Sequence, residues 1–370
     1  MKVLVVGGGP AGSLSAANLS ERAEVTLVEA KGASGFPAKC GGLISEDCFE
    51  ALSRYCRASR ALQNRIDGAF FFSPSGRYVE LRGKSRAVVV ERKALDPMLL
   101  QAASKSVDVR MKTRFAGADG GKVRLVEQGE ERFERFDLII GADGPESVVA
   151  RTYGFERPEI FTGKQYLMEF EPIDERMVEL YFGKKYSSGF FAYAIPVEKD
   201  VARVGVVSRE NTSAHLERLL TSHPSVSERA GRSIYEVNSG PIPIGLVDFV
   251  RDGVALVGDS AGMVKPYTGG GMYYLLRAAE LLGEHFPDME GFRKSYLREM
   301  GREYSSGERI RRLYDSLDDE DYDFLIEVAR DVDFSSLHMD SPSTALKLLP
   351  EVLKLVKRPS IAVKIARVMV

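Results

Sequence analysis

The distribution of apolar and polar residues at the start of the chain predicts a βαβ unit. Residues 2–6 form a short apolar strand pattern, residues 10–19 a helical pattern and residues 24–28 a second strand pattern. Two strands connected through a helix normally pair in parallel, so this opening predicts a parallel sheet. The alternation of strand and helix resumes with a strand at residues 87–90 and a helix at Asp96-Pro97. The helix is predicted to begin there because Asp is a good N-cap and Pro fits a first helical turn.

Other stretches of the chain show the pattern of an antiparallel sheet. Two short strands at residues 69–72 and 78–81, joined by a turn at residues 74–76, are predicted to be inserted into the first domain. Residues 164–207 alternate between apolar and polar positions and carry many aromatic side chains. This alternation is typical of an antiparallel sheet with one face in the core, so we expect a second domain there.

The parallel pattern resumes late in the chain, which makes the first domain discontinuous in sequence. Strands are predicted at residues 137–140 and 254–257, and from about residue 270 onward the pattern is helical. The predicted boundaries are residues 1–65, 84–155 and 240–290 for the parallel α/β domain, residues 66–83 and 156–239 for the inserted antiparallel-sheet domain, and residues 291–370 for a helical C-terminal region.

Composition limits the classes of function. The 51 Lys and Arg residues are balanced by 53 Asp and Glu residues, which argues against a nucleic-acid partner. The chain has no apolar run of about 18 residues, so neither a membrane span nor an export signal is predicted. The three cysteines, Cys40, Cys48 and Cys56, are too few for a disulfide framework and favour a reducing cytoplasm; Cys48 and Cys56 are expected to be buried in a helix. With only four histidines, no metal-ligand cluster is predicted.

A glycine fingerprint gives the first indication of chemistry. Gly7, Gly9 and Gly12 form G-x-G-x-x-G between the first strand and the first helix, and Glu29 ends the next strand. Gly7 permits a tight turn, Gly9 lets a pyrophosphate approach the helix N-terminus, and Gly12 allows the helix to pack closely on the strand. Glu29 is placed to accept hydrogen bonds from ribose hydroxyls. The motif predicts a dinucleotide site without separating NAD from FAD.

Two later strands end in acidic glycine turns. The predicted strand at residues 137–140 runs on into Asp143-Gly144, where the backbone can approach phosphates. Gly258-Asp259 follows the second strand and places a carboxylate that is suited to accept hydrogen bonds from a polyol such as ribityl. Arg92 stands at a strand-to-helix corner, where taken alone a solvated charge is the more usual explanation.

Three consecutive glycines, Gly269, Gly270 and Gly271, lead into a helix at Met272. Glycines there would let a planar ring lie against the backbone, and the helix N-terminus would face the flavin pyrimidine edge, where negative charge accumulates on reduction. An ordinary turn and helix cap is the alternative explanation.

In this order, the motifs resemble those of the aromatic-hydroxylase superfamily of flavoproteins, and within it the geranylgeranyl reductase family. The discriminating segments are the Cys-Gly loop Lys39-Cys40-Gly41-Gly42-Leu43-Ile44-Ser45 and the segment Gly258-Asp259-Ser260-Ala261-Gly262, which Pro266 and the three glycines follow. Together they cover most of residues 1–290. One segment departs from the family: its Tyr-x-Trp-x-Phe-Pro motif is replaced by Phe191-Ala192-Tyr193-Ala194-Ile195-Pro196, and flavin-dependent halogenases carry Trp-x-Trp-x-Ile-Pro at the comparable place. The departure concerns the substrate rather than the cofactor.

The resemblance implies an α/β fold with a Rossmann-like FAD-binding domain, an inserted antiparallel β-sheet substrate domain and a helical C-terminus. It also implies FAD as the cofactor. Phe115 is expected to contact FAD only because of its position on a strand. Lys39, Cys40 and Gly42 are expected to line the part of the site where flavin and substrate meet. The full set of expected cofactor-binding residues is Gly7, Gly9, Ala11, Gly12, Glu29, Lys39, Cys40, Gly42, Arg92, Phe115, Asp143, Gly258, Asp259, Gly269, Gly270, Gly271 and Met272.

The activity that the resemblance implies is saturation of isolated double bonds in isoprenoid chains, including those of archaeal membrane lipids. Such an alkene has no carbonyl to polarise, so its reduction needs a hydride from flavin N5 and a proton from a positioned acid. Cys40 is the candidate acid, with Tyr193 as an alternative donor or a packing group. A thiol without chemistry, and aromatics that only pack a sheet face, are the competing explanations.

Two other functions stay open on the sequence. One is a flavin monooxygenase or halogenase, for which Lys84 is the only nearby lysine and a poor candidate. The other is a flavin electron carrier or lipid-binding protein without turnover of its own. No second G-x-G-x-x-G is present, so ferredoxin, NADPH or another donor can be the reductant. Residues 345–370 are basic and amphipathic, which fits either packing on the body of the protein or peripheral contact with the inner membrane surface.

Overall fold

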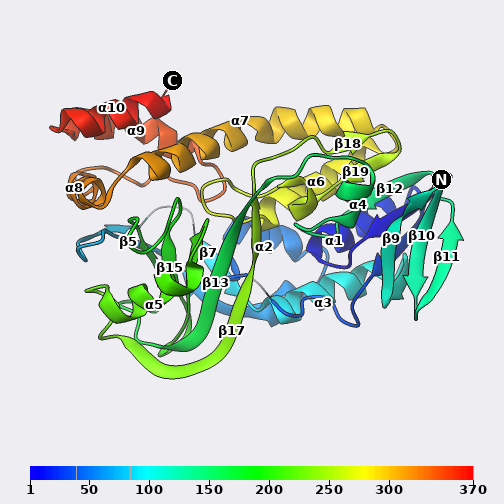
Figure 1. Cartoon of the computed structure of the whole chain (residues 1–370), viewed down its shortest axis with the longest axis horizontal. Coiled ribbons are helices and arrows are strands. Elements are labelled where there is room, and N and C mark those ends of the chain that lie inside the picture. The colour runs from blue at the N-terminus through cyan, green and yellow to red at the C-terminus, as the bar shows by residue number, and fades with distance from the viewer. Residues whose placement is uncertain (39, 83–85, 370) are drawn as a thin grey trace.

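A six-stranded, mainly parallel sheet forms the first layer of the protein. The computed structural model describes residues 1–38, 40–82 and 86–369 (Figure 1). Every strand pair in this sheet is parallel except for one antiparallel edge strand, β18. In spatial order the strands are β18 (Val250–Arg251), β19 (Val254–Leu256), β12 (Leu138–Gly141), β1 (Lys2–Val6), β2 (Glu24–Glu29) and β8 (Asp108–Met111).

Helices cover this sheet, as its apolar strands require. Helix α1 (Pro10–Leu19) connects β1 to β2 and packs against α3 (Arg92–Ala103) and α6 (Met272–His285). Strand β1 is buried from Val3 onward, as expected for a parallel sheet that is covered on its faces. The predicted βαβ opening is confirmed.

Helix α3 begins earlier than its sequence indicates. It was expected to begin at Asp96-Pro97, yet its first residue is Arg92. The Glu91 side chain takes the N-cap role and accepts a hydrogen bond from the Lys93 amide at 3.0 Å. Asp96 instead turns inward and pairs with Arg92, so the predicted start is wrong by one helical turn.

Two small sheets flank the parallel sheet. The first holds β3 (Leu43–Ser45), β7 (Ala87–Val90) and β4 (Leu62–Ile66). The second is a three-stranded antiparallel sheet of β9 (Thr113–Asp119), β10 (Lys122–Glu127) and β11 (Glu130–Glu134). Short helical segments α2 (Glu46–Leu52), η1 (Ala58–Ala61), α4 (Val148–Thr152) and η2 (Gly258–Ala261) connect these elements. Cys48 is buried in α2 as predicted, but α2 ends at Leu52 and leaves Cys56 in a turn, so its predicted helical position is wrong.

A seven-stranded sheet forms the second layer. All its neighbours are antiparallel except β5 and β14, which pair in parallel. In spatial order it holds β17 (Ala230–Ile244), β13 (Glu159–Phe170), β16 (Val201–Ser208), β15 (Ala192–Glu198), β14 (Met177–Tyr181), β5 (Gly68–Phe72) and β6 (Tyr78–Leu81). Helix α5 (Thr212–Ser222) packs against β13 and β16.

The C-terminal part is helical and runs from one sheet to the other. Helix α7 (Met289–Ser316) begins beside α6 at the parallel sheet and crosses the molecule to the seven-stranded sheet (Figure 1). Helices α8 (Asp319–Ala329), α9 (Ser343–Leu355) and α10 (Pro359–Met369) follow at that end.

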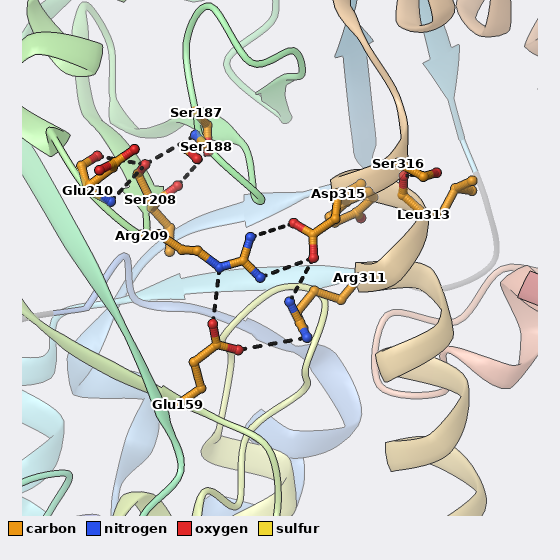
Figure 2. Close-up of polar contacts among 12 residues, drawn as sticks. Glu159, Ser187, Ser188, Ser208, Arg209, Glu210, Arg311, Leu313, Asp315 and Ser316 are labelled. Atoms are coloured by element: carbon orange, nitrogen blue, oxygen red, sulfur yellow. Dashed lines mark hydrogen bonds and ion pairs between the residues drawn. The ribbon is translucent and has the colours of Figure 1, made fainter. Parts of the chain in front are cut away.

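An ion-pair network fastens the end of α7 to the seven-stranded sheet. Arg209, just after β16, donates to both carboxylate oxygens of Asp315 on α7 at 2.6 and 3.0 Å, and to Glu159 of β13 at 3.0 Å (Figure 2). Arg311 of α7 joins the same carboxylate of Asp315 at 3.2 Å. The network fixes the position of the neighbouring turn of α7, whose apolar side chains face the cavity described below.

The predicted fold class is confirmed: the protein combines a parallel α/β layer, an antiparallel-sheet layer and C-terminal helices. Within residues 1–38, 40–82 and 86–369, no helix has both the length and the apolar character needed to cross a bilayer. Nor do the residues described bring three or more His, Cys, Asp or Glu side chains together in a group able to hold a metal ion.

Candidate active site

One elongated cavity of about 1030 Å³ connects the glycine turn after β1 to the C-terminal helices. Its first end is lined by polar loops that follow the parallel strands, at residues such as Gly9, Asp143 and Asp259. Its other end is apolar and lies between the seven-stranded sheet and the helices α7 to α10. The cavity therefore joins a polar compartment to an apolar one.

The glycine turn has the geometry of a phosphate site. Gly7 has φ +107°, and a Cβ there would lie 2.3 Å from the Ala142 carbonyl oxygen; a Cβ on Gly12 would lie 1.8 Å from the Gly7 carbonyl oxygen. Gly9 differs, because a Cβ there would meet no atom within 4 Å. Gly9 is the N-cap of α1 and supplies no side-chain cap, so amides of the first turn are left for an anion, with Ala11 also on the cavity wall.

Glu29 ties this turn to the end of β2. Its carboxylate accepts hydrogen bonds from the Gly8 amide at 2.7 Å and from the Lys31 amide at 2.8 Å. Each carboxylate oxygen can accept a second bond, so acceptor capacity remains for a sugar hydroxyl. The predicted position of Glu29 beside the glycine turn matches the structure.

Asp259 offers a half-buried carboxylate to the cavity. It lies in η2, and in the part of the chain that the structure describes no hydrogen-bond partner is found for its side chain. Burial raises the pKa of Asp259, and the nearby cation of Arg92 opposes that rise. A carboxylate of this kind needs donors, and the hydroxyls of a ribityl chain are suitable ones. The residues present therefore fit FAD.

Arg92 is not the solvated charge that its sequence context alone favours. Its side chain is 18% exposed and donates two hydrogen bonds to Asp96, at 2.6 and 2.9 Å. Both residues line the cavity. A buried guanidinium is a suitable partner for a phosphate or a ring carbonyl because its charge is already held in place by Asp96.

Asp143 organises the turn before α4. Its carboxylate accepts hydrogen bonds from the Ser147 hydroxyl at 2.5 Å and from the amides of Val148 and Val149 at 2.7 and 3.1 Å. Burial raises the pKa of Asp143 and these bonds oppose the rise. Asp143 lines the cavity while all of these bonds go to its own loop. Close by, a Cβ on Gly258 would lie 2.7 Å from the Cβ of Ala11, so η2 and α1 approach closely there.

The triple-glycine turn forms the wall between the two compartments. Gly269, Gly270, Gly271 and Met272 line the cavity, and Gly271 is the N-cap of α6 without a side-chain cap. The positive end of α6 therefore faces the cavity. The turn is held by Lys265, whose amide donates to the Gly270 carbonyl at 3.0 Å.

Lys265 also reaches the C-terminal region, a connection that the sequence did not indicate. Its ammonium group donates to the Met339 carbonyl at 3.0 Å and to the Asp340 carboxylate at 2.9 Å. The Tyr267 hydroxyl donates to the same Met339 carbonyl at 2.7 Å. Both charged side chains are buried, at 7% exposed for Lys265 and 3% for Asp340. The segment before α9 is thus fixed to the triple-glycine turn.

The Cys40 loop lies against the seven-stranded sheet. Gln165 of β13 donates to the Cys40 carbonyl at 3.0 Å and accepts a hydrogen bond from the Tyr193 hydroxyl at 2.9 Å. Arg203 of β16 donates to the Gly41 carbonyl at 3.2 Å. Cys40 is exposed, Tyr193 is half-buried and Gly42 is buried, and all three line the cavity. Burial raises the pKa of Tyr193. The structure brings the two candidate catalytic residues together through Gln165.

Gln165 and Arg203 were missed in the sequence because no motif contains them. Each is a buried polar residue in a strand that is otherwise largely apolar. Such a residue requires partners. Gln165 has the Cys40 carbonyl and the Tyr193 hydroxyl, and Arg203 has the Gly41 carbonyl together with the side chains of Gln63 and Glu91. That interruption of the apolar pattern is the feature that indicates them.

Three further residues named in the sequence analysis complete the comparison. Lys39, expected near the flavin, and Lys84, the poor candidate for halogenation, lie outside the described residues. Phe115 is 3% exposed in the core between the sheets, and it is not among the residues that line the cavity. A contact of Phe115 with FAD stays a prediction.

The apolar compartment is built from two faces. The sheet contributes the aromatic segment with Phe191, Tyr193 and Ile195, and the helices contribute leucine, valine and isoleucine side chains of α7, α9 and α10. Phe191 also stacks on Phe190 with ring centroids 5.1 Å apart. The aromatic segment therefore packs within the sheet and lines the cavity at the same time.

Comparison with known proteins places the chain in a family. The sequence matches the FAD binding domain family over residues 1–283. It is 30% identical over 366 residues to digeranylgeranylglycerophospholipid reductase 1 of Methanothermobacter thermautotrophicus, covering 90% of this chain and 92% of the relative. It is 29% identical over 370 residues to digeranylgeranylglycerophospholipid reductase of Methanosarcina acetivorans, covering 91% of this chain and 90% of the relative.

Solved structures agree on the fold. The crystal structure of a geranylgeranyl bacteriochlorophyll reductase-like protein from Thermoplasma acidophilum has a TM-score of 0.83 at 24% identity and covers 96% of this chain and 99% of that one. The protein is thus a flavoprotein whose cofactor is FAD. It belongs to the FAD-binding family that includes the digeranylgeranylglycerophospholipid reductases, as its motifs predicted.

Proposed function

We propose that the protein uses FAD to saturate isolated carbon–carbon double bonds in the isoprenoid chains of membrane lipids. The observation that carries the proposal is the continuity of the cavity, in which an apolar compartment opens directly onto the loops that fit FAD. An apolar chain of this class has few polar groups for recognition, so its affinity must come from burial of apolar surface. The relatives named above as digeranylgeranylglycerophospholipid reductases support the substrate class.

The chemistry divides between the cofactor and the chain. The glycine turn, Glu29 and Asp259 would hold FAD, which would supply the hydride when reduced by an external donor such as ferredoxin or NADPH. The chain's own residues must place the double bond, exclude water and deliver one proton to the other alkene carbon. We assign proton delivery to Cys40, with Gln165 and Tyr193 holding its loop against the sheet.

The direct test is reduction of a geranylgeranyl lipid. Purified protein with bound FAD is photoreduced without oxygen and incubated with the lipid, and the product is analysed by mass spectrometry. A mass gain of two hydrogens per reduced bond is expected. A product that forms only with oxygen would replace this proposal by a monooxygenase or halogenase. Flavin that stays reduced until a second protein is added would replace it by an electron carrier.

Cys40 is tested with a matched cysteine control. Cys40→Ala is expected to retain FAD and to slow alkene reduction by orders of magnitude, whereas Cys56→Ala should leave the rate unchanged because Cys56 lies in a turn and is not among the cavity-lining residues. Normal turnover of Cys40→Ala would remove the thiol from the mechanism and leave Tyr193 as the candidate donor.

We further propose that the protein contacts the membrane surface through its last two helices. Lys347, Lys354, Lys357 and Arg358 are exposed, while the apolar side of α9 lines the cavity. Each such cation contributes about 1 kcal/mol near an anionic bilayer. Lys354→Glu with Lys357→Glu should therefore reduce co-sedimentation with phosphatidylglycerol vesicles, and unchanged binding would exclude this surface.

A further inference from the structure

A second, polar cavity of about 380 Å³ lies in the seam between α7 and α9. Helix α7 contributes Arg302, Ser306 and Arg309, which recur at helical spacing on one face, and α9 contributes Lys347. Three cations thus converge on a space large enough for a small anion.

Nothing in the described structure neutralises these cations. Within residues 1–38, 40–82 and 86–369, no carboxylate forms an ion pair with Arg302, Arg309 or Lys347, whereas Arg293 and Arg311 on the same helix α7 do have such partners. Arg309 makes one contact, to the Met369 carbonyl at 3.4 Å. The Glu303 carboxylate of α7 instead accepts hydrogen bonds from the amide and hydroxyl of Ser343, which also lines this cavity, at 3.0 and 2.8 Å.

Ser306 provides a second, independent indication of a ligand. The residue is 5% exposed and lines this cavity, yet its hydroxyl has no hydrogen-bond partner among the described residues. Its neighbour Ser305 satisfies its own hydroxyl with the Arg302 carbonyl at 3.0 Å. The Ser306 hydroxyl therefore opens onto the cavity without a protein partner, and a phosphate oxygen there would accept its hydrogen bond.

The polar cavity adjoins the apolar one. Leu346 lines both cavities. Ile310, next to Arg309 in the chain, lines the apolar compartment. A ligand with a phosphate head and an apolar chain can therefore place its head among the cations and lead its chain past Leu346.

We propose that the seam between α7 and α9 is a binding subsite for a phosphate group, and that in catalysis this group is the head of an isoprenoid lipid. The assignment of the lipid rests on the proposed function, whereas the phosphate subsite rests on the cluster itself. Phosphate suits three cations and a hydroxyl because it offers several strong acceptor oxygens and a double negative charge.

The test compares two ligands that differ only in the head group, geranylgeranyl phosphate and geranylgeraniol. Calorimetric titration of the FAD-bound protein is expected to show at least about tenfold tighter binding of the phosphate, with a preference that falls as salt is raised. Arg302→Gln with Lys347→Gln should remove most of that preference and leave geranylgeraniol binding unchanged. The matched control, Arg312→Gln with Lys354→Gln, removes two exposed cations from the same helices outside both cavities and should retain the preference.

The outcomes separate the two levels of the proposal. Equal affinity of wild-type protein for both ligands, or equal loss of both in the double variant, would overturn the subsite. Inorganic phosphate should compete with geranylgeranyl phosphate but not with geranylgeraniol; binding of inorganic phosphate without competition would assign the subsite to free phosphate and overturn the lipid head. If the phosphate preference holds while photoreduced protein saturates neither ligand, the subsite stands and the proposed function fails. If both ligands are saturated with the same KM, the function stands and the subsite fails.

Discussion

The buried pair between Lys265 and Asp340 gives the sharpest prediction about stability. One Asp340 oxygen accepts a hydrogen bond from Lys265 at 2.9 Å, and the other is buried with no partner among the residues that the structure describes. Replacing Lys265 by Met leaves that carboxylate buried and unpaired, which costs about 3–5 kcal/mol of unfolding free energy. Replacing both residues, as Lys265→Met with Asp340→Leu, removes both charges, so the double variant should regain most of the loss.

The effect should also be local. The Lys265 and Tyr267 contacts to residues 339 and 340 hold the segment before α9, so amide hydrogen exchange in α9 should accelerate in Lys265→Met more than in α1. Urea unfolding of the wild-type protein, the two single variants Lys265→Met and Asp340→Leu, and the double variant gives the coupling free energy between the two side chains. A loss below about 1 kcal/mol in the single variant, or a double variant as unstable as the two losses summed, would refute the reasoning.

Three further predictions concern other parts of the molecule. Burial lowers the pKa of His223 from 6.5 to about 4, so the unfolded chain takes up a proton first and stability should fall by roughly 3 kcal/mol as the pH drops from 6.5 to 4. His223→Gln should flatten that part of the stability profile, and an unchanged slope would exclude His223 as its source. Asp143→Ala removes the acceptor for the Val148 and Val149 amides in the first turn of α4 and should cost about 1–2 kcal/mol in urea unfolding, whereas a neutral result would mean that the Ser147 N-cap holds this turn without it. Of the cysteines, exposed Cys40 should react quickly with a thiol reagent and buried Cys48, whose pKa burial raises, only on unfolding; fast labelling of Cys48 in folded protein would contradict the structure.

The sequence predicted the layers of this fold because their patterns are local. A strand, a glycine turn and a helix occupy consecutive residues, and the same is true of Gly258-Asp259 and the triple-glycine turn. The predicted start of α3 was wrong because both Glu91 and Asp96 are suitable N-cap residues, and only the folded structure shows which of them caps the helix. Local chemistry therefore gives the elements more reliably than their ends.

The rest of the site depends on contacts between distant residues. Lys265 meets Asp340 across 75 positions, and Gln165 meets Cys40 across 125. Neither pair shares a motif or a helical or strand period, so a single sequence gives no indication that they meet. The phosphate seam is similar, since α7 and α9 contribute its residues from different parts of the chain.

The path of the chain also has a consequence for biosynthesis. The loops that fit FAD are complete by Met272, but one wall of the apolar compartment comes from residues 310–368, which leave the ribosome afterwards. A nascent chain can thus bind its cofactor while the apolar face of the seven-stranded sheet is still exposed to solvent. Until α9 and α10 dock, that face is a target for chaperones or aggregation, and premature termination before Ser343 would leave the apolar compartment open to water on the side of these helices.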